Sequence, residues 1–438
     1  MSAATLVVGL GVTGRAVVAA LRSRGHDVVA TEDEPTAEHR DFAAVHGIEL
    51  HERPDAATLR ELTTAAASIV PSPGIPDAHG VFDAARRSGT PIRSELDLAG
   101  EWDSRPILAV TGTNGKTTVT ELATRMLTAS GIDAVAAGNT ETPLVTAIDD
   151  PMTDVFVVEA SSFRLGHTQR FTPKVATWLN FGPDHLDVHA SLDRYEEAKA
   201  SIWRDQGPDD VAVVNLDDPT VMRHRPTVPR VVEVGEAGEY HATANELRIG
   251  DEVLVPRAAL WRDLPHDCFD VLAAAATVLP AGATLAGVRE AIAVFEGLPH
   301  RVQLVGESGG VRWYDDSKAT TPHAVSAAVS GFETVVLIAG GKNKGIDLRP
   351  LAETIDRIRA VIAIGDAATE VEAVFAAHRP VVTADSMTEA VDAAAAAAVS
   401  GDAVVLSPGC TSFDWYRNYG ERGDDFARLV RALVGEGR

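Results

Sequence analysis

A glycine-rich run in the first third of the chain has the residue types that hold the phosphates of a nucleotide. Its sequence is Thr111-Gly112-Thr113-Asn114-Gly115-Lys116-Thr117-Thr118, which ends in the Gly-Lys-Thr of a phosphate-binding loop, although Val110 stands where such loops usually begin with glycine. Consecutive backbone N–H groups there can surround an anion. Lys116 would bring a positive charge to the β- and γ-phosphates, and Thr117 a hydroxyl ligand for Mg²⁺. Because a purely structural turn would not need that lysine, the pattern predicts a nucleotide phosphate site.

Two side chains that can ligate a metal follow apolar runs typical of buried strands. Glu159 ends the run at 155–159, and His185 lies in the loop after a strand predicted at 175–180. A carboxylate at the carboxyl end of a parallel strand faces the crevice in which α/β proteins bind ligands. Either residue alone is more often a cap or turn residue, but both together beside a phosphate loop favour a metal site. Lys199 follows Tyr195 by one helical turn, and the pattern alone indicates an exposed helix lysine.

A second glycine-rich loop, Gly9-Leu10-Gly11-Val12-Thr13-Gly14, matches the G-x-G-x-x-G pattern between a predicted strand and a predicted helix. The pattern fits a diphosphate at a helix N-terminus, and it also fits a tight turn without a ligand. Glu32 or Asp33 lies at the spacing expected of a ribose partner. An NAD-dependent oxidoreductase is therefore an alternative function, but it leaves Lys116 and Glu159 without a role. A nucleotide-sensing protein without activity is a second alternative, which the full set of chemical residues disfavours.

The elements that must position these residues alternate between short apolar runs and Ala-rich helical stretches. This alternation predicts an α/β fold of parallel sheets covered by helices. Joints at 103–106 and 297–299 divide the chain into three predicted domains, 1–103, 104–297 and 298–438. Residues 230–255 read instead as an antiparallel hairpin or meander. The predicted strands include one at 91–93 and, in the last domain, those at 311–314, 335–339, 360–364, 380–382 and 403–406.

The composition excludes several classes of protein. The chain has 438 residues and a formal net charge of −24, which disfavours binding to nucleic acid or anionic lipid because both need clustered Lys and Arg. Cys268 and Cys410 are the only cysteines, so a disulfide framework is excluded and a reducing compartment is favoured. The first residues lack the basic segment of a signal peptide, and no apolar run nears the ~20 residues of a membrane span. We expect a cytoplasmic protein without membrane insertion or a nucleic-acid partner.

Motifs along the whole chain resemble, in order, those of the Mur ligases. They are Thr111-Gly-Thr-Asn-Gly-Lys-Thr-Thr, Glu159-Ala-Ser-Ser-Phe, Asp184-His-Leu-Asp, Tyr195 with Lys199, His300-Arg301, Asp316-Ser-Lys-Ala-Thr and Ser407-Pro-Gly-Cys-x-Ser. Within the family, the members that add glutamate to UDP-N-acetylmuramoyl-L-alanine are most similar at Ser72-Pro-Gly-Ile-Pro, Gly340-Gly-Lys-Asn-Lys and Tyr416-Arg-Asn-Tyr-Gly-Glu-Arg-Gly.

This resemblance implies a fold and an activity. The fold would have a Rossmann-like UDP-binding domain, a central P-loop-type ATPase domain and a Rossmann-like C-terminal domain. The activity would be an ATP-dependent amide ligase of peptidoglycan precursor synthesis. ATP would phosphorylate the carboxylate of UDP-N-acetylmuramoyl-L-alanine, and the amine of glutamate would attack the acyl phosphate. The use of D-glutamate is expected, and a variant that takes L-glutamate stays an alternative.

The resemblance also implies site residues. ATP would contact Gly112, Thr113, Asn114, Gly115, Lys116, Thr117 and Thr118, with Arg301 and Asp316. The UDP-substrate would contact Gly11, Val12, Thr13, Ser72, Pro73, Gly74, Asn139 and Ser161, and glutamate would contact Thr320, Lys344, Ser412 and Tyr419. Two Mg²⁺ ions would be held by Thr117, Glu159, His185 and a carbamylated Lys199, and the catalytic set would be Lys116, Glu159, His185 and Lys199. A monomer that closes about the joint at 297–299 is expected.

The chain also differs from the family's usual pattern. Asp267 and Asp270 stand where Asn residues usually contact adenine, and an ionised Asp accepts hydrogen bonds but cannot donate them. Tyr419 stands where Phe is common, which adds a hydroxyl beside the glutamate. Glu141 replaces a usual glycine, and residues 31–33 lack the common Asp-Thr-Arg.

Overall fold

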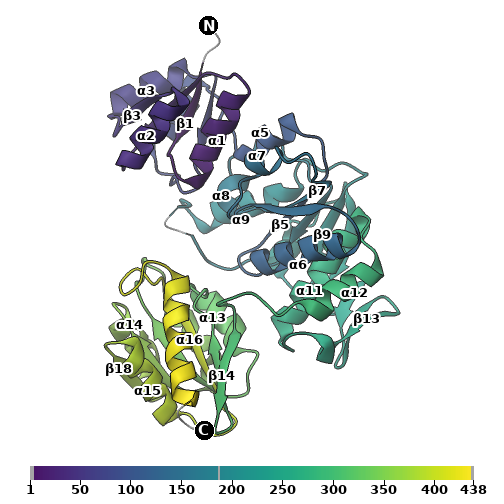
Figure 1. The fold of residues 1–438 in the computed structure, drawn as a ribbon, viewed down its shortest axis with the longest axis vertical. Helices are drawn as coiled ribbons and strands as arrows, with labels where there is room; N and C mark the ends of the chain where they lie inside the picture. Colours follow the sequence, from purple (N-terminus) through teal and green to yellow (C-terminus); the bar gives the residue numbers. More distant parts are fainter. Residues whose placement is uncertain (1–3, 186–187, 436–438) are drawn as a thin grey trace. The chain divides into compact units, whose positions relative to one another are not determined.

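The computed structural model describes residues 4–185 and 188–435 (Figure 1). Among these residues the chain forms three sheets, and it packs as two compact units. One unit runs to Asp263 and includes Asp267–Phe295, and the other joins Leu264–His266 to the chain from Glu296 onward. Strands alternate with helices and pair mostly in parallel, so the predicted α/β class is confirmed. Leu186 and Asp187, which complete one of the motifs above, lie outside the described residues.

The first sheet is parallel and has the strand order β3-β2-β1-β4. Its elements are β1 (Thr5–Val8), α1 (Val12–Ser23), β2 (Val28–Glu32), α2 (Ala37–His46), β3 (Glu49–Glu52), α3 (Ala56–Ala65), β4 (Ser68–Pro71) and α4 (Gly80–Ser88). The prediction of a strand at 91–93 is wrong. In this segment Ile92 forms a single isolated bridge with Ile69 and no ladder follows. Pro91 has no N–H to donate to a ladder, and Ser94 at once caps the helix α5 (Glu95–Trp102).

The second sheet has the order β13-β12-β11-β10-β9-β8-β5-β7-β6. Its parallel part is built from β5 (Ile107–Thr111), α6 (Lys116–Ala129), β6 (Ala134–Gly138), α7 (Leu144–Ala147), β7 (Val155–Glu159), α8 (Ser162–Leu165), β8 (Val175–Trp178), α9 (Leu192–Ala200) and β9 (Val211–Asn215). The helices α11 (Pro265–Val278) and α12 (Leu285–Val294) belong to the same region. Because β5 lies between β7 and β8, the loops that follow these strands meet at one edge of the sheet.

The segment read as a meander is only partly antiparallel. The strands β11 (Tyr240–Ala242), β12 (Glu246–Ile249) and β13 (Glu252–Pro256) pair antiparallel as predicted. The strand β10 (Arg230–Val234) pairs parallel with β9, because the short helix α10 (Pro219–Arg223) carries the chain back to the start of the sheet.

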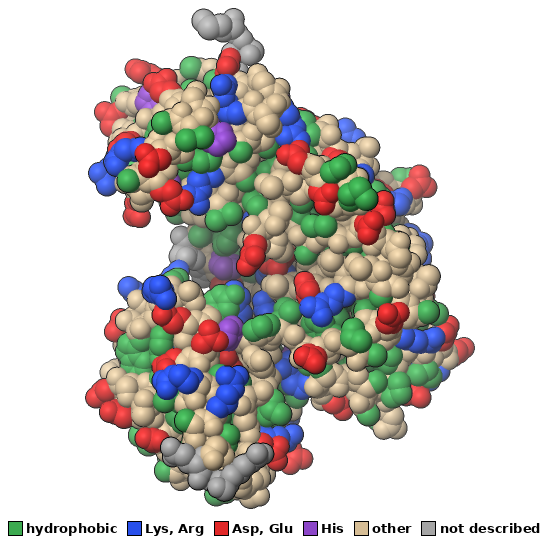
Figure 2. Space-filling view, in the orientation of Figure 1, with side chains coloured by type: hydrophobic (Ala, Val, Ile, Leu, Met, Phe, Trp, Pro, Cys, Tyr) green, Lys and Arg blue, Asp and Glu red, His purple; other side chains and the backbone are tan. Residues whose placement is uncertain are grey.

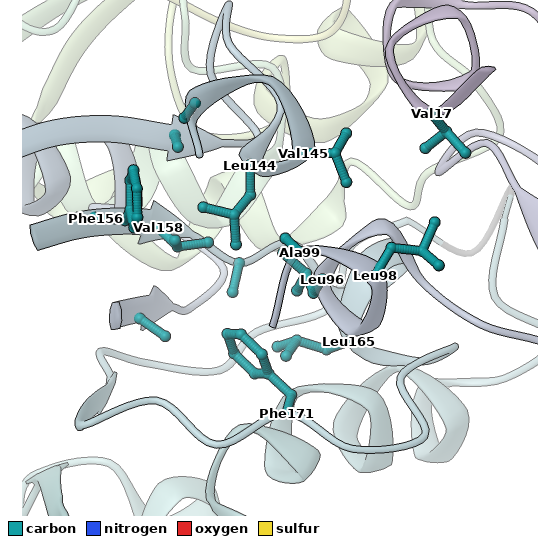
Figure 3. Packing of buried hydrophobic residues seen from close by; sticks show 14 of the residues in the cluster. Val17, Leu96, Leu98, Ala99, Leu144, Val145, Phe156, Val158, Leu165 and Phe171 are labelled. Atoms are coloured by element: carbon teal, nitrogen blue, oxygen red, sulfur yellow. The ribbon is translucent and has the colours of Figure 1, made fainter. Parts of the chain in front are cut away.

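The helix α5 joins the hydrophobic cores of the first two sheets. Figure 3 shows Leu96, Leu98 and Ala99 of α5 facing side chains of α1 and α7, among them Val17 and Val145. All of these residues belong to one continuous cluster of buried side chains. The two sheets of this unit are therefore packed through a shared core.

The third sheet, in the other unit, has the order β14-β15-β19-β16-β17-β18. Its elements are β14 (Gln303–Ser308), β15 (Val311–Asp315), α13 (Pro322–Val329), β16 (Val335–Gly340), β17 (Ile358–Ile364), α14 (Ala368–Phe375), β18 (Val381–Ala384), α15 (Met387–Ala397), β19 (Ala403–Gly409) and α16 (Tyr419–Gly435). The strands predicted here are present with shifted ends. The antiparallel strand β14 was not predicted, and it turns into β15 through Gly309 and Gly310, whose φ angles of 59° and 77° suit a two-residue hairpin.

The surface and the thiols agree with the composition. On the face that Figure 2 shows, acidic side chains are scattered among Lys and Arg instead of gathering in one block. Within the described ranges, no helix is both long and apolar enough to cross a membrane. Both cysteines are buried free thiols, and burial raises the pKa of Cys268 to about 11 and that of Cys410 to about 12. They therefore stay protonated at neutral pH.

Candidate active site

The phosphate loop connects β5 to α6 and is held from the end of β8. Gly115 caps α6 with a φ of 82°, and a Cβ there would lie 2.7 Å from Asp270 Oδ1, so only glycine fits. Asn180 Oδ1 accepts hydrogen bonds from the backbone N–H groups of Thr113, at 3.1 Å, and Asn114, at 2.9 Å. The helix N-terminus behind this loop presents backbone N–H groups to an anion.

Two lysine side chains donate to the same carbonyl of this loop. Lys116 Nζ lies 2.8 Å from the Gly112 carbonyl oxygen, and Lys199 Nζ lies 2.6 Å from it. Lys116 also donates to the carbonyl of Thr113 at 3.0 Å. The two amines thus reach one point of the loop from different helices, α6 and α9. The first turn of α6 carries half-buried Thr117 and buried Thr118.

Lys199 is buried, so its interpretation as an exposed helix lysine is wrong. Its exposed fraction is 1%, and its Nζ lies 4.6 Å from the centre of the Tyr195 ring. Burial and then the charge of Lys116 lower the pKa of Lys199 well below that of a free lysine, while Asp184 and Glu159 act in the opposite direction. The physical consequence is an amine that loses its proton more readily than a surface lysine.

Glu159 ends β7 beside the strand that leads into the phosphate loop, where it pairs in register with Val110. It is 2% exposed, and its Oε1 accepts a hydrogen bond from Asn139 Nδ2 at 2.9 Å. Its Oε2 is also buried and has no hydrogen-bond partner among the described residues. A buried carboxylate oxygen without a partner is costly, and an oxygen-seeking cation such as Mg²⁺ would satisfy it. The residue present here therefore fits a magnesium site.

His185 lies at the same edge of the sheet, in the loop after β8. Gly182 of this loop donates its backbone N–H to Thr113 Oγ1 at 3.0 Å. His185 has a φ of 56°, and its Nε2 lies 3.2 Å from Asp184 Oδ2. Its ring packs edge-on against Phe163, with the ring centres 4.7 Å apart. In the part of the chain that the structure describes, no three His, Cys, Asp or Glu side chains form a metal cluster.

The N-terminal glycine loop is closed by its own side-chain contacts. Ser72 Oγ donates to the Gly9 carbonyl at 2.7 Å, and Glu32 Oε2 accepts from the backbone N–H of Leu10 at 2.7 Å. One oxygen of the Glu32 carboxylate is therefore engaged by its own loop. The other residues predicted for the UDP-substrate in this loop region are Gly11, which caps α1, exposed Val12, half-buried Pro73 and exposed Gly74.

The residues predicted for glutamate follow neighbouring strands of the third sheet. Thr320 follows β15, Lys344 follows β16 and Ser412 follows β19, which lies between these two strands. The loops are joined by backbone hydrogen bonds between Lys342 and Thr411, at 2.8 and 3.1 Å. All three residues thus follow strands at the carboxyl edge of this sheet.

Aromatic rings and lysines meet at the same edge. Tyr419 begins α16 and is 37% exposed, and Lys318 Nζ lies 3.9 Å from the centre of its ring. Lys344 Nζ lies 5.5 Å from the centre of the Phe413 ring, which is 56% exposed. Lysines over accessible rings form a positively charged surface that suits a small anion.

Asp316 supports the segment that carries Arg301. Its Oδ1 accepts from the backbone N–H of Val302 at 3.2 Å, and its Oδ2 accepts from Ser407 Oγ at 2.7 Å. Val302 has a φ of 48°, a conformation that a β-branched residue adopts only when its surroundings hold it there. In this structure the Asp316 carboxylate therefore shapes the loop around Arg301.

Comparison with known proteins identifies the family to which this chain belongs. The Mur ligase middle domain matches residues 110–254, and the Mur ligase glutamate ligase domain matches residues 300–410. The chain is 39% identical to the UDP-N-acetylmuramoylalanine--D-glutamate ligase of Frankia casuarinae, over 98% of this chain and 94% of that protein. This chain belongs to the Mur ligase family. The protein of the same name from Nitrosococcus oceani is 36% identical, over 99% of this chain and 98% of that protein.

Solved structures share the fold of this Mur ligase. A pseudomurein peptide ligase type C from Methanothermus fervidus has a TM-score of 0.61 at 17% identity, covering 99% of this chain and 100% of that chain. The UDP-N-acetylmuramate-alanine ligase MurC from Thermotoga maritima has a TM-score of 0.58 at 17% identity, with coverage of 99% and 100%. At these identities the likeness concerns the three-domain α/β architecture.

In this Mur ligase, three residues of the predicted UDP set converge on Arg164, which none of the sequence motifs singles out. Its guanidinium donates to Asn139 Oδ1 at 2.8 Å and to Thr13 Oγ1 at 2.9 Å, and Ser161 Oγ lies 3.5 Å away. The signal available in the sequence was its position directly after the Glu159 motif, in Glu-Ala-Ser-Ser-Phe-Arg.

The two aspartates that depart from the family pattern lie in the same unit as the phosphate loop. Asp267 is 1% exposed and accepts two hydrogen bonds from Arg262, at 2.7 and 2.6 Å. Asp270 reaches Gly115 of the phosphate loop. Arg262 thus holds the Asp267 carboxylate in a two-pronged ion pair.

Proposed function

We propose that this Mur ligase adds D-glutamate to UDP-N-acetylmuramoyl-L-alanine, with ATP as the activating nucleotide, in peptidoglycan precursor synthesis. The observation that carries the proposal is the similarity along nearly the whole chain, at 34–39% identity, to relatives named UDP-N-acetylmuramoylalanine--D-glutamate ligase. The buried Lys199 and Glu159 beside the phosphate loop support it, because phosphoryl transfer needs concentrated charge and metal ligands there.

The chemistry is activation of a poor electrophile. The substrate carboxylate attacks the γ-phosphorus of ATP, and ADP leaves with the electrons of the broken P–O bond. The amine of glutamate then attacks the acyl carbon. The new C–N bond forms as the C–O bond to phosphate breaks, and the proton lost by the nitrogen leaves with inorganic phosphate as hydrogen phosphate. Lys116 and the backbone N–H groups at the start of α6 would stabilise the negative charge on the phosphoryl oxygens during the transfer.

Thr117, Glu159 and His185 would hold Mg²⁺, whose contribution there is to neutralise phosphate charge. The unpartnered Oε2 of Glu159 supports this role. The lowered pKa of Lys199 supports carbamylation, because only an uncharged amine has the lone pair that attacks CO₂. The N–C bond forms with loss of one proton, and the resulting carbamate would give an anionic oxygen to a second Mg²⁺.

The N-terminal loop, Ser72–Gly74, Asn139 and Ser161 would bind the UDP-substrate, while Thr320, Lys344, Ser412 and Tyr419 would bind glutamate. Arg301 and Asp316 would contribute to the ATP site. We also propose that the active enzyme is a monomer. A cytoplasmic location suits an ATP-consuming enzyme whose two cysteines are free thiols.

The test is phosphate release by purified protein with ATP, Mg²⁺ and UDP-N-acetylmuramoyl-L-alanine, comparing D-glutamate, L-glutamate and meso-diaminopimelate. We expect phosphate release with D-glutamate and not with the other two amino acids. Mass spectrometry should then show a product that is heavier than UDP-N-acetylmuramoyl-L-alanine by one glutamyl residue. Faster release with L-glutamate would favour the L-specific variant. No release with any amino acid would overturn the proposal.

A further inference from the structure

Arg164 lies on the short helix α8 and is almost completely buried, with 5% of its side chain exposed. Its Nε donates to Glu95 Oε1 at 2.9 Å, which forms a buried ion pair with the start of α5. Its terminal nitrogens donate to Asn139 Oδ1 after β6 and to Thr13 Oγ1 on α1. One guanidinium therefore joins four separate elements, including the N-terminal glycine loop.

The contact with Asn139 determines which way that amide faces. A guanidinium has donors only, so the Asn139 oxygen must face Arg164 and its Nδ2 must face the other way. There Nδ2 donates to Glu159 Oε1 at 2.9 Å, while the backbone N–H of Asn139 donates to the Glu159 carbonyl at 2.9 Å. These bonds engage one carboxylate oxygen of Glu159 and leave Oε2 for a cation.

We propose that Arg164 is a positioning residue, which orients the metal ligand Glu159 through Asn139 and ties it to Thr13 in the N-terminal loop. This inference rests on the proposed function, in which Glu159 binds Mg²⁺. The competing explanation is that Arg164 only neutralises Glu95. Experiments can distinguish the two explanations, because the ion pair and the Asn139 contact use different nitrogens of the same guanidinium.

The test measures Mn²⁺ binding to the full-length protein carrying ATP, with free Mn²⁺ followed by paramagnetic resonance. In Arg164→Lys the charge opposite Glu95 is kept, but a single ammonium cannot bridge Glu95, Asn139 and Thr13 at once. We expect its Mn²⁺ dissociation constant to rise about 10-fold, the lower end of the effect of removing outer partners of metal ligands.

The matched control is Glu95→Gln, which breaks the ion pair and leaves the other contacts of Arg164. Its melting temperature should fall while its Mn²⁺ affinity stays within about 2-fold of wild type.

Three results would overturn the proposal: unchanged Mn²⁺ affinity in Arg164→Lys, an equal loss in Glu95→Gln, or no Mn²⁺ binding by the wild-type protein. If Arg164→Lys does not fold, the double variant Glu95→Gln/Arg164→Met removes both buried charges and should show the same loss of affinity. Mn²⁺ binding needs no ligation. The two proposals can therefore fail separately. If the wild-type protein releases no phosphate, but Arg164→Lys binds Mn²⁺ more weakly than the wild type, the proposed function is refuted and the positioning role is supported.

Discussion

The two glycine-rich loops of this protein have similar local geometry and different ionisable side chains bound to their backbone. Each follows a parallel strand and leads into a helix, at Gly9–Gly14 after β1 and at Gly112–Lys116 after β5. The N-terminal loop has the Glu32 carboxylate bonded to its backbone, whereas the phosphate loop has two lysine Nζ atoms bonded to one carbonyl. The glycine spacing therefore predicts only that the backbone of a loop can approach a ligand closely. The charged side chains around the loop determine which kind of ligand it binds.

A triphosphate with its metal needs local positive charge, above all in a chain whose net charge is −24. Lys116 of the phosphate loop supplies that charge. The carboxylate at the N-terminal loop would repel a triphosphate, so this loop suits a less charged ligand group held by backbone N–H groups. The following variants test this contrast.

The largest effect is expected for Lys116→Ala. Ligation should fall by roughly 100-fold or more, because the γ-phosphate loses a local cation. Calorimetric titration with UDP-N-acetylmuramoyl-L-alanine should give the wild-type affinity, since that ligand is assigned to the N-terminal loop. Ligation above a tenth of the wild-type rate at saturating ATP would contradict the assignment.

A comparable loss, of about 100-fold, is expected for Lys199→Ala. If the carbamate of Lys199 provides an anionic oxygen, millimolar acetate or another small carboxylate should partly restore the rate. The matched variant Lys199→Arg should stay inactive with the same additive, because its guanidinium forms no such carbamate and repels a metal ion. A normal rate in Lys199→Arg would refute carbamylation.

A smaller effect, on one substrate, is expected for Lys344→Ala. The KM for glutamate should rise about 10- to 100-fold, since a carboxylate loses a charge-assisted hydrogen bond worth about 1.5–3 kcal/mol. The exposed Lys342 lies two residues earlier, and Lys342→Ala serves as the control with an unchanged KM. Equal weakening of glutamate and the UDP-substrate in Lys344→Ala would be inconsistent with this assignment.

The smallest effect is expected for Gly14→Ala. An added Cβ would lie 1.9 Å from the Gly9 carbonyl oxygen, so the N-terminal loop must shift, at a cost of about 1–3 kcal/mol. The dissociation constant of the UDP-substrate should rise roughly 5-fold or more with ATP affinity unchanged. Gly100→Ala on α5, where an added Cβ meets no atom within 4 Å, is the control. A loss of ATP affinity instead would mean that the two loops are not independent.

Local patterns determined much of the fold. The strand β7 covers the apolar run at 155–159, because an apolar run between turn residues is a property of neighbouring residues. The errors concern which segments pair with a neighbouring strand. The 91–93 segment has the composition of a strand but only one bridge, and β14 becomes a strand only because β15 returns beside it.

For the site, the sequence by itself determined the chemical groups: the Gly-Lys-Thr loop, the carboxylate of Glu159 and the imidazole of His185. The burial and the lowered pKa of Lys199, and the contacts behind the role proposed for Arg164, are visible only in the tertiary structure. Lys199 meets a carbonyl 87 residues away, and Arg164 meets Thr13 across 151 residues. Burial, pKa and hydrogen-bond direction depend on atoms that such distant segments bring together, and a pattern of neighbouring residues carries no information about them.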